Sequence, residues 1–297
     1  MAKGQSLKTL SLGGGLLALL FLAACPPASG PGPDDQAKSA KAGARSLYTV
    51  AGMTSAIKQL HQARGAHRKG LQAGYEKEYK VDPKHPFKRF LWAYSLDDRN
   101  QAWQELSKIT KLNDRFLWAY LGMGMILDEW KVYDQAEVNF KMALKFGPKV
   151  SLVYGAYGRM LLHKGDGAAA LEMLERAVKI APDSLECRLN LARAQAAAGK
   201  TKAALANYAL LSKSKSDDPQ VFSEWATLQA KEGEKAEAVE SLSQVAKLDP
   251  KAYGERRQRA RLLVDLDRVD EAVEAYNDAC RVGKDDACWR ELVALGK

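Results

Sequence analysis

The sequence predicts an all-α solenoid of about six helix pairs with a helical cap at each end, and three regularities with a 34-residue period predict it. Alanines recur at this spacing, as Ala102, Ala136, Ala170, Ala204, Ala238 and Ala272. A large apolar or tyrosine side chain follows each after four residues, as Leu106, Phe140, Leu174, Tyr208, Leu242 and Tyr276. Pro148, Pro182 and Pro250 lie on the same grid, and Ser216 breaks it. Such a period is typical of stacked units that bury their apolar faces against one another.

Residues 1–24 have the pattern of a secretion signal. Lys3 and Lys8 precede an uncharged apolar run from Leu10 to Ala24. This run of about 15 residues is shorter than the roughly 20 that a membrane-spanning helix needs, so we expect it to be cleaved. Its end, Leu22-Ala23-Ala24-Cys25, resembles the bacterial lipobox, and the resemblance implies lipid attachment to Cys25. The alternative is an ordinary secretion signal in which this cysteine occurs by chance.

Residues 25–45 are predicted to form a flexible tether after the lipidated cysteine, because they consist mainly of Pro, Gly, Ser, Ala and charged residues. A chain of this composition reaches roughly 25 Å on average. Position 26 is Pro. In the enterobacterial lipoproteins that the motif resembles, Asp at this position retains the protein at the inner membrane. The resemblance therefore implies a lipid anchor in the outer membrane, with the folded part facing the periplasm.

Residues 46–82 are predicted to form an N-terminal helical cap. Met53, Ile57 and Leu60 recur on one face of a helix expected within Leu47 to Tyr79, and the region lacks the 34-residue grid. We expect it to cover the exposed apolar face of the first repeat. A compatible alternative is that its basic residues contact anionic lipid headgroups; these are Lys58, Arg64, Arg68 and Lys69.

Residues 83–286 divide into six units, 83–116, 117–150, 151–184, 185–218, 219–252 and 253–286. The clearest unit carries Tyr120, Met123, Gly124 and Leu127, then Ala136, Phe140, Ala143 and Pro148. This pattern resembles the tetratricopeptide repeat, which implies a right-handed α-solenoid. Its small residues allow paired helices to approach to about 8–10 Å, and its proline ends the second helix. The two terminal units fit less well, because Pro86, Arg89, Arg256 and Arg259 replace large apolar residues.

The C-terminal end carries a cysteine pair and a last predicted helix. Residues 287–297 are expected to form a C-terminal capping helix. The sequence around Cys280 and Cys288 resembles secreted Sel1-like repeats, and the resemblance implies a disulfide between these two cysteines. So short a loop is expected to add about 2–3 kcal/mol of stability. Cys187 is expected to be a small buried apolar residue.

The sequence shows no pattern typical of an enzyme, and no cofactor, metal or small-molecule substrate is predicted. It has neither an HExxH-like pair nor a phosphate-binding loop, and its histidines are His61, His67, His85 and His163. The cysteine spacing matches no metal site. The net charge of +9 falls to about +7 without Lys3 and Lys8. Nucleic acid is not expected outside the cytoplasm, so acidic protein segments, anionic lipid or wall polymers fit this charge better.

The repeat resemblance places repeat positions 2, 5, 9, 12 and 13 in a concave, partner-binding groove. Position 9 changes from apolar to basic along the chain, as Leu91, Met125, Arg159, Arg193, Thr227 and Arg261. The candidate groove residues are Phe87, Leu91, Trp118, Leu121, Met125, Arg159, His163, Arg193, Arg257 and Arg261. We expect an extended or helical peptide, apolar at one end and acidic at the other. The alternative is that Phe87 and Trp118 pack under the N-terminal helix and the arginines are solvated.

Tetratricopeptide lipoproteins of this size resemble secretin pilotins, which help to assemble the outer-membrane ring of type IV pili, and scaffolds of motility or export machines. The resemblance implies a non-enzymatic scaffold that binds an envelope protein. The alternative function is a periplasmic accessory protein that binds peptidoglycan or cell-wall enzymes.

Overall fold

The computed structural model describes residues 48–214, 217–284 and 286–295, and every regular element within these ranges is an α-helix. The all-α prediction is therefore confirmed for this part of the chain. The predictions on the signal segment, the lipidation of Cys25 and the tether fall on residues 1–45 and lie outside the described residues.

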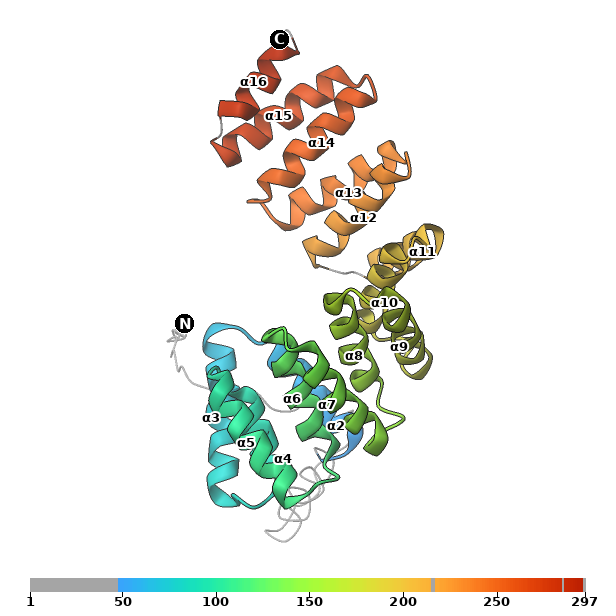
Figure 1. Cartoon of the computed structure of the whole chain (residues 1–297). Coiled ribbons are helices and arrows are strands. Elements are labelled where there is room, and N and C mark those ends of the chain that lie inside the picture. The colour runs from blue at the N-terminus through green and yellow to red at the C-terminus, as the bar shows by residue number, and fades with distance from the viewer. Residues whose placement is uncertain (1–47, 215–216, 285, 296–297) are drawn as a thin grey trace, which may run out of the picture. The chain divides into compact units, whose positions relative to one another are not determined.

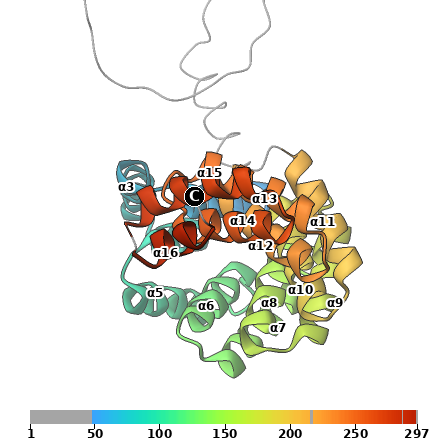
Figure 2. The same ribbon diagram turned by 90° about the horizontal axis from the view of Figure 1, so that it is seen from above.

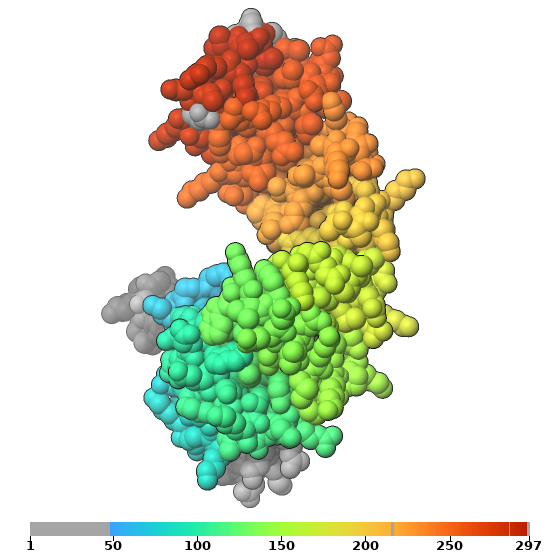
Figure 3. Space-filling model, in the orientation of Figure 1, coloured from blue at the N-terminus to red at the C-terminus, as the bar shows by residue number. Residues whose placement is uncertain are grey.

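Twelve of the helices form six consecutive antiparallel pairs, one in each 34-residue unit. The pairs are α4 (Pro86–Ser95) with α5 (Arg99–Leu112), α6 (Leu117–Glu129) with α7 (Tyr133–Phe146), α8 (Ser151–Lys164) with α9 (Gly167–Ile180), α10 (Leu185–Ala197) with α11 (Thr201–Lys213), α12 (Pro219–Lys231) with α13 (Lys235–Leu248), and α14 (Tyr253–Asp265) with α15 (Val269–Gly283). The pairs follow one another in chain order (Figure 1), and the side chains of successive pairs meet in the space-filling view (Figure 3).

The repeated small residues bring the two helices of each pair together. All six alanines of the 34-residue grid are 0% exposed. A Cβ atom built on Gly158 would lie 2.5 Å from Cγ of Leu174, and one built on Gly124 would lie 3.0 Å from Cε1 of Phe140. Larger residues at these glycines would therefore force the paired helices apart, which explains why the sequence keeps them small.

The turn between the two helices of a pair has its own repeated conformation. Its left-handed backbone position recurs every 34 residues, at Lys131, Gly165, Gly199, Gly233 and Asp267. Glycine adopts this conformation without steric cost, so three of the five turns use the residue that suits it. Among the helices that follow these turns, α9 begins with an acidic side-chain cap, because Asp166 accepts a hydrogen bond from the backbone N–H of Ala169.

The segment predicted as one N-terminal cap forms two helices with different positions. Helix α3 (Gly65–Val81) packs on α4 at the end of the solenoid, where the Tyr79 and Trp92 rings stack at 4.2 Å. Helix α2 (Val50–Gln62) instead buries one face in the apolar core that continues through the first three pairs. At the other end, α16 (Asp286–Ala294) packs on α15. The cap is therefore α3, and α2 has a separate role.

Candidate functional site

The first helices of the pairs, α4, α6, α8, α10, α12 and α14, form what we call the first-helix surface, and α2 lies on part of it. Seen from above, α7 and α9 lie on the outer side of α6 and α8, so the first and the second helices of these pairs form separate layers (Figure 2). On α2, Met53, Ala56, Ile57 and Leu60 are buried. The His61 side chain at its end hydrogen-bonds the hydroxyl of Tyr94 on α4. One face of α2 therefore packs on the first-helix surface.

The apolar half of the predicted groove is already filled. Leu91, Trp118, Leu121 and Met125 are buried, and they share one apolar cluster with the buried residues of α2. Phe87 lies at the edge of this cluster, with its ring 4.9 Å from that of Phe116. The expectation that these side chains are open to a partner needs correction, because they are buried in the cluster that α2 joins.

The basic half of the predicted groove is neutralised by carboxylates on neighbouring helices. Arg193 on α10 donates to both carboxylate oxygens of Glu224 on α12, at 2.8 and 2.7 Å. Burial lowers and the Glu224 hydrogen bonds raise the pKa of Arg193, and the net change is upward. This pair spans consecutive first helices and so stabilises their contact. The prediction that such arginines await an acidic partner is therefore not supported by their surroundings.

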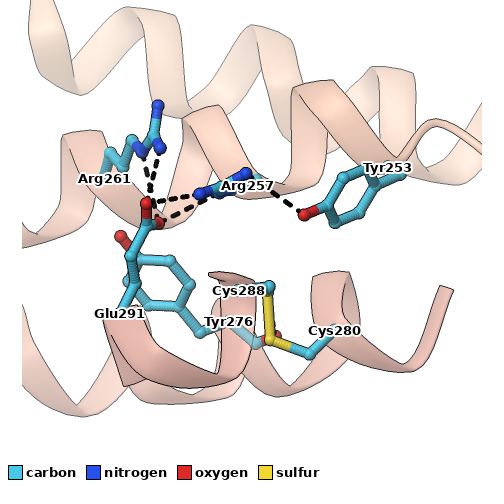
Figure 4. Close-up of a disulfide and its surroundings, with 7 residues drawn as sticks. All are labelled: Tyr253, Arg257, Arg261, Tyr276, Cys280, Cys288 and Glu291. Atoms are coloured by element: carbon cyan, nitrogen blue, oxygen red, sulfur yellow. Dashed lines mark hydrogen bonds and ion pairs between the residues drawn. A yellow bond between two sulfur atoms is a disulfide. The ribbon is translucent and has the colours of Figure 1, made fainter. Parts of the chain in front are cut away.

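The C-terminal arginines form the same kind of contact, as Figure 4 shows. Arg257 and Arg261 on α14 both donate to Glu291 on α16, each with a shortest distance of 2.6 Å. These bonds hold the pKa of Glu291 at about 2, well below its usual value. Beside them, Cys280 and Cys288 form a disulfide that joins α15 to α16. The disulfide therefore fixes the helix that carries the carboxylate.

Beyond the end of α2 the first-helix surface is open. A cavity of about 830 Å³ lies between the C-terminal end of α2 and helices α6, α8, α10 and α12. Its walls include Leu189 and Val221, and the side of Leu185, which is 41% exposed. Of all the predicted groove residues, Met125, Arg159 and His163 line this cavity.

Charge in this cavity is dominated by carboxylates. Arg159 lies between Asp128 at 3.9 Å and Glu186 at 3.8 Å, so one guanidinium serves two acids. The side chain of Asp128 is buried and is hydrogen-bonded to Nδ1 of His163 at 2.8 Å. Glu129, which is paired with Arg99 at 2.8 Å, and Asp218 also line the cavity, as does a second guanidinium, that of Arg64. A bound cation would therefore find more negative than positive charge there.

The sequence analysis did not predict the carboxylates that neutralise the arginines, Glu224 and Glu291, because it considered each repeat position separately. The signal that could have found them is an opposite charge about one repeat further along the chain. Glu224 follows Arg193 by 31 residues, and Glu291 follows Arg257 by 34. In a solenoid with a 34-residue period, such a separation places two side chains on equivalent helices of neighbouring units, and α16 follows α15 as a first helix follows each pair.

The structure also bears on Cys187, on metal binding and on membrane-spanning helices. Cys187 is a buried free thiol whose pKa is raised by burial. In the part of the chain that the structure describes, no three His, Cys, Asp or Glu side chains are placed to hold a metal ion. None of the described helices is long and apolar enough to cross a membrane.

Comparisons with known proteins support the fold. A family model described as tetratricopeptide repeat matches residues 161–232. The human Superkiller complex protein 3 is 25% identical over 159 residues, which are 53% of this chain and 10% of that protein. The crystal structure of the APC/C hetero-tetramer Cut9-Hcn1 superposes with a TM-score of 0.63 at 14% identity, over 81% of this chain and 48% of that chain. The chain thus spans less than half the length of these two proteins.

Two further solved structures are similar to this chain over nearly their whole length. The Pseudomonas aeruginosa pilF structure has a TM-score of 0.57 at 17% identity, and covers 76% of this chain and 98% of its own. The structure of PilW, described as a widely conserved type IV pilus biogenesis factor, has a TM-score of 0.55 at 17% identity, over 73% and 94%. At these identities the likeness shows a shared fold, and the prediction of an α-solenoid of tetratricopeptide-type helix pairs is confirmed.

Proposed function

We propose that this chain is a non-enzymatic scaffold that binds a protein partner and helps to assemble an envelope machine, such as a secretin, a type IV pilus or a motility complex. The solenoid fold supports binding to another protein, and the likeness to pilF and PilW supports an assembly role. A fold by itself does not determine a function, so the proposal depends on the surface that the partner contacts.

The single observation that carries it is the open cavity on α6, α8, α10 and α12. It combines the exposed side chain of Leu185 and the half-buried one of Leu189 with the carboxylates of Asp128 and Glu186 around the Arg159 guanidinium. A partner segment that fits it has apolar side chains and at least one positive charge. This positively charged partner segment replaces the acidic one that the arginine positions predicted.

Site-specific photocrosslinking in cells tests this surface. A crosslinker at position 189 or 163, in the cavity, is expected to capture a component of an outer-membrane assembly. The matched control is position 138, because Val138 is exposed on the second helix α7. Equal capture from all three positions, or none from 189 and 163, would reject the cavity as the binding surface. Capture of glycan or of a wall hydrolase would instead favour the cell-wall function.

We also propose that Cys25 carries a lipid that anchors the protein in the outer membrane, facing the periplasm. The support is the sequence from Leu22 to Cys25 and the proline at position 26. Several acyl chains on one residue give a far firmer anchor than one chain does. Metabolic labelling with an alkyne fatty acid should mark the parent protein and not Cys25→Ser. Recovery of the unlabelled parent in the soluble fraction would refute the anchor.

A further inference from the structure

Helix α2 packs on the first-helix surface, and its buried face joins the same apolar cluster as the side chains inside the first three pairs. Within the pairs, Phe140 packs against Gly124 and Leu174 against Gly158, so these contacts lie between the two helices of one pair. The side chains in the cluster with α2, such as Leu121, belong to the face that the repeat pattern assigns to a bound partner. These contacts inside the pairs are made without a side chain of α2, although both belong to one continuous cluster.

Helix α2 is attached through its apolar face and through its C-terminal end. Its buried residues are Met53, Ala56, Ile57 and Leu60, which share one face at helical spacing. The hydrogen bond from His61 to Tyr94 adds a polar contact at the end. Only Ala63 and Arg64 separate α2 from α3, and the chain is extended at both. Rotation at this short link would move α2 and break the hydrogen bond from Arg68 to Leu60, while the contacts of α3 with the solenoid stay in place.

Helix α3 is held to the solenoid independently of α2. Tyr79 stacks on Trp92, Lys88 pairs with Glu78 at 3.3 Å, and Arg68 pairs with Asp97 at 3.2 Å. Arg68 also donates to the carbonyl oxygen of Leu60, at 2.8 Å, and so helps to fix the end of α2. Arg68 thus contacts both α2 and the loop after α4, and α3 can remain docked as a cap.

The occupied part of the surface continues directly into the open cavity. His61, Gln62 and Arg64, at the end of α2, form one wall of that cavity, and Met125 belongs to both regions. A segment bound in the cavity therefore touches the end of α2. The bound segment can extend further along the first-helix surface only if α2 leaves that surface.

We propose that α2 is a replaceable occupant of the first-helix surface, and that an amphipathic helix of the partner takes its place. The partner helix has large apolar residues spaced like Met53, Ile57 and Leu60, and a small residue at the place of Ala56. This inference rests on the proposed function, because it names the form that the partner takes on the same surface. It differs from it in requiring α2 to leave.

Thiol labelling of the full chain tests whether α2 leaves independently. Ala56→Cys places a thiol on the buried face of α2, and the control Ala170→Cys places one between α8 and α9, where Ala170 is also buried. Peptide-resolved mass spectrometry separates these thiols from Cys187. Labelling of Ala56→Cys is expected to be at least about tenfold faster than that of the control, as local opening predicts. Equal rates would show that α2 leaves only on global unfolding, and would overturn the proposal.

Binding of a synthetic helix tests whether the vacated surface accepts a partner. The probe is a fluorescent peptide of residues 49–64, and its control carries Ile57→Asp and Leu60→Asp. A full-length variant with Ile57→Ala and Leu60→Ala has a weakened α2 and should bind the probe at least about tenfold more tightly than the parent does, because the resident helix competes less. Circular dichroism checks that the solenoid helices remain.

Two results would contradict the proposal: equal binding of the probe by variant and parent, or equal binding of the probe and its control peptide. If the variant does not fold, the thiol-labelling rates still decide. Loss of crosslinks from position 189 would refute the proposed function, whereas a fixed α2 with those crosslinks intact would refute the replacement alone.

Discussion

His61 is the polar residue at which α2 meets the first helices, and its environment predicts a pH dependence. Burial lowers the pKa of His61 below its usual value; Glu186 raises it, while Arg159, Arg68 and Arg99 lower it further. When α2 leaves, this side chain gains water and binds a proton at higher pH. The docked helix is therefore most stable above about pH 6.5, and its stability falls as the pH drops through the lower pKa of the docked state.

Hydrogen exchange of the α2 amides, compared at about pH 7.5 and pH 5.5 after correction for intrinsic rates, should show reduced protection at the lower pH. The His61→Gln variant removes the titrating group and should lose most of this difference. His67, which is exposed on α3, supplies the control His67→Gln, which should retain it. A difference that is unchanged in His61→Gln would assign the effect to another group.

The paired arginines show a second point at the scale of the residue. Arg193, Arg257 and Arg261 occupy repeat positions that face a ligand in the resembled family, yet each is bound to a carboxylate one repeat away. The charge at one sequence position does not reveal the charge of the residue that lies beside it in the fold. The partner proposed above is positively charged because the charges of the arginines and of the neighbouring carboxylates have to be added together.

At the scale of the element, the left-handed turns offer a simple test of local strain. Lys131 adopts a φ of 61° at the turn position where the next three repeats have glycine. Lys131→Gly removes the steric cost of the side chain there and is expected to stabilise the protein by about 0.5–1 kcal/mol. The control Lys179→Gly, at a right-handed position in α9, should destabilise it by a similar amount. Urea denaturation measures both, and loss of stability in Lys131→Gly would contradict the prediction.

The disulfide acts on α16, the shortest helix of the described chain. Because it closes a loop over a sequence separation of 8, its removal should cost about 2–3 kcal/mol of local stability. The variant with Cys280→Ala and Cys288→Ala is expected to exchange the α16 amides faster and to release Glu291 from Arg257 and Arg261. Hydrogen exchange by mass spectrometry measures this. Exchange in α6 and α8, which are distant in the chain, should stay unchanged, and faster exchange there would show that the effect is global.

At the scale of the whole molecule, the apolar core is divided along the chain. One large cluster contains buried residues from α2 to α10, and a second contains residues from α12 to α16. Smaller clusters lie between them, around Tyr208 and Phe222. Stability in a solenoid is approximately a sum over neighbouring units, so weak coupling at one place allows the two sides to unfold separately.

A core substitution on one side should therefore act mainly on that side. Leu263 on α14 is fully buried, and Leu263→Ala is expected to cost about 2–5 kcal/mol. Hydrogen exchange in α12–α16 should accelerate, while α4–α8 keep their protection. Leu121→Ala on α6 should give the opposite pattern. Equal acceleration on both sides in either variant would show that the solenoid unfolds as one cooperative unit.

The sequence by itself determined the repeats. The 34-residue spacing of Ala136 and Ala170 requires helix pairs, because a small residue at a fixed place in every unit serves one recurring helix contact, and the structure has that contact. Such contacts are local, since each involves two helices joined by a short turn. The resemblance to known repeats added the cysteine pair that the structure joins.

Only the tertiary structure decided what lies on the first-helix surface. The apolar pattern of Met53, Ile57 and Leu60 predicts that α2 buries a face, and it does not say against which helices. That choice depends on contacts between residues far apart in the sequence, such as His61 with Tyr94 and Arg193 with Glu224. A periodic sequence fixes the contacts within and between neighbouring units, whereas a non-repeated segment is placed by whichever apolar surface remains uncovered.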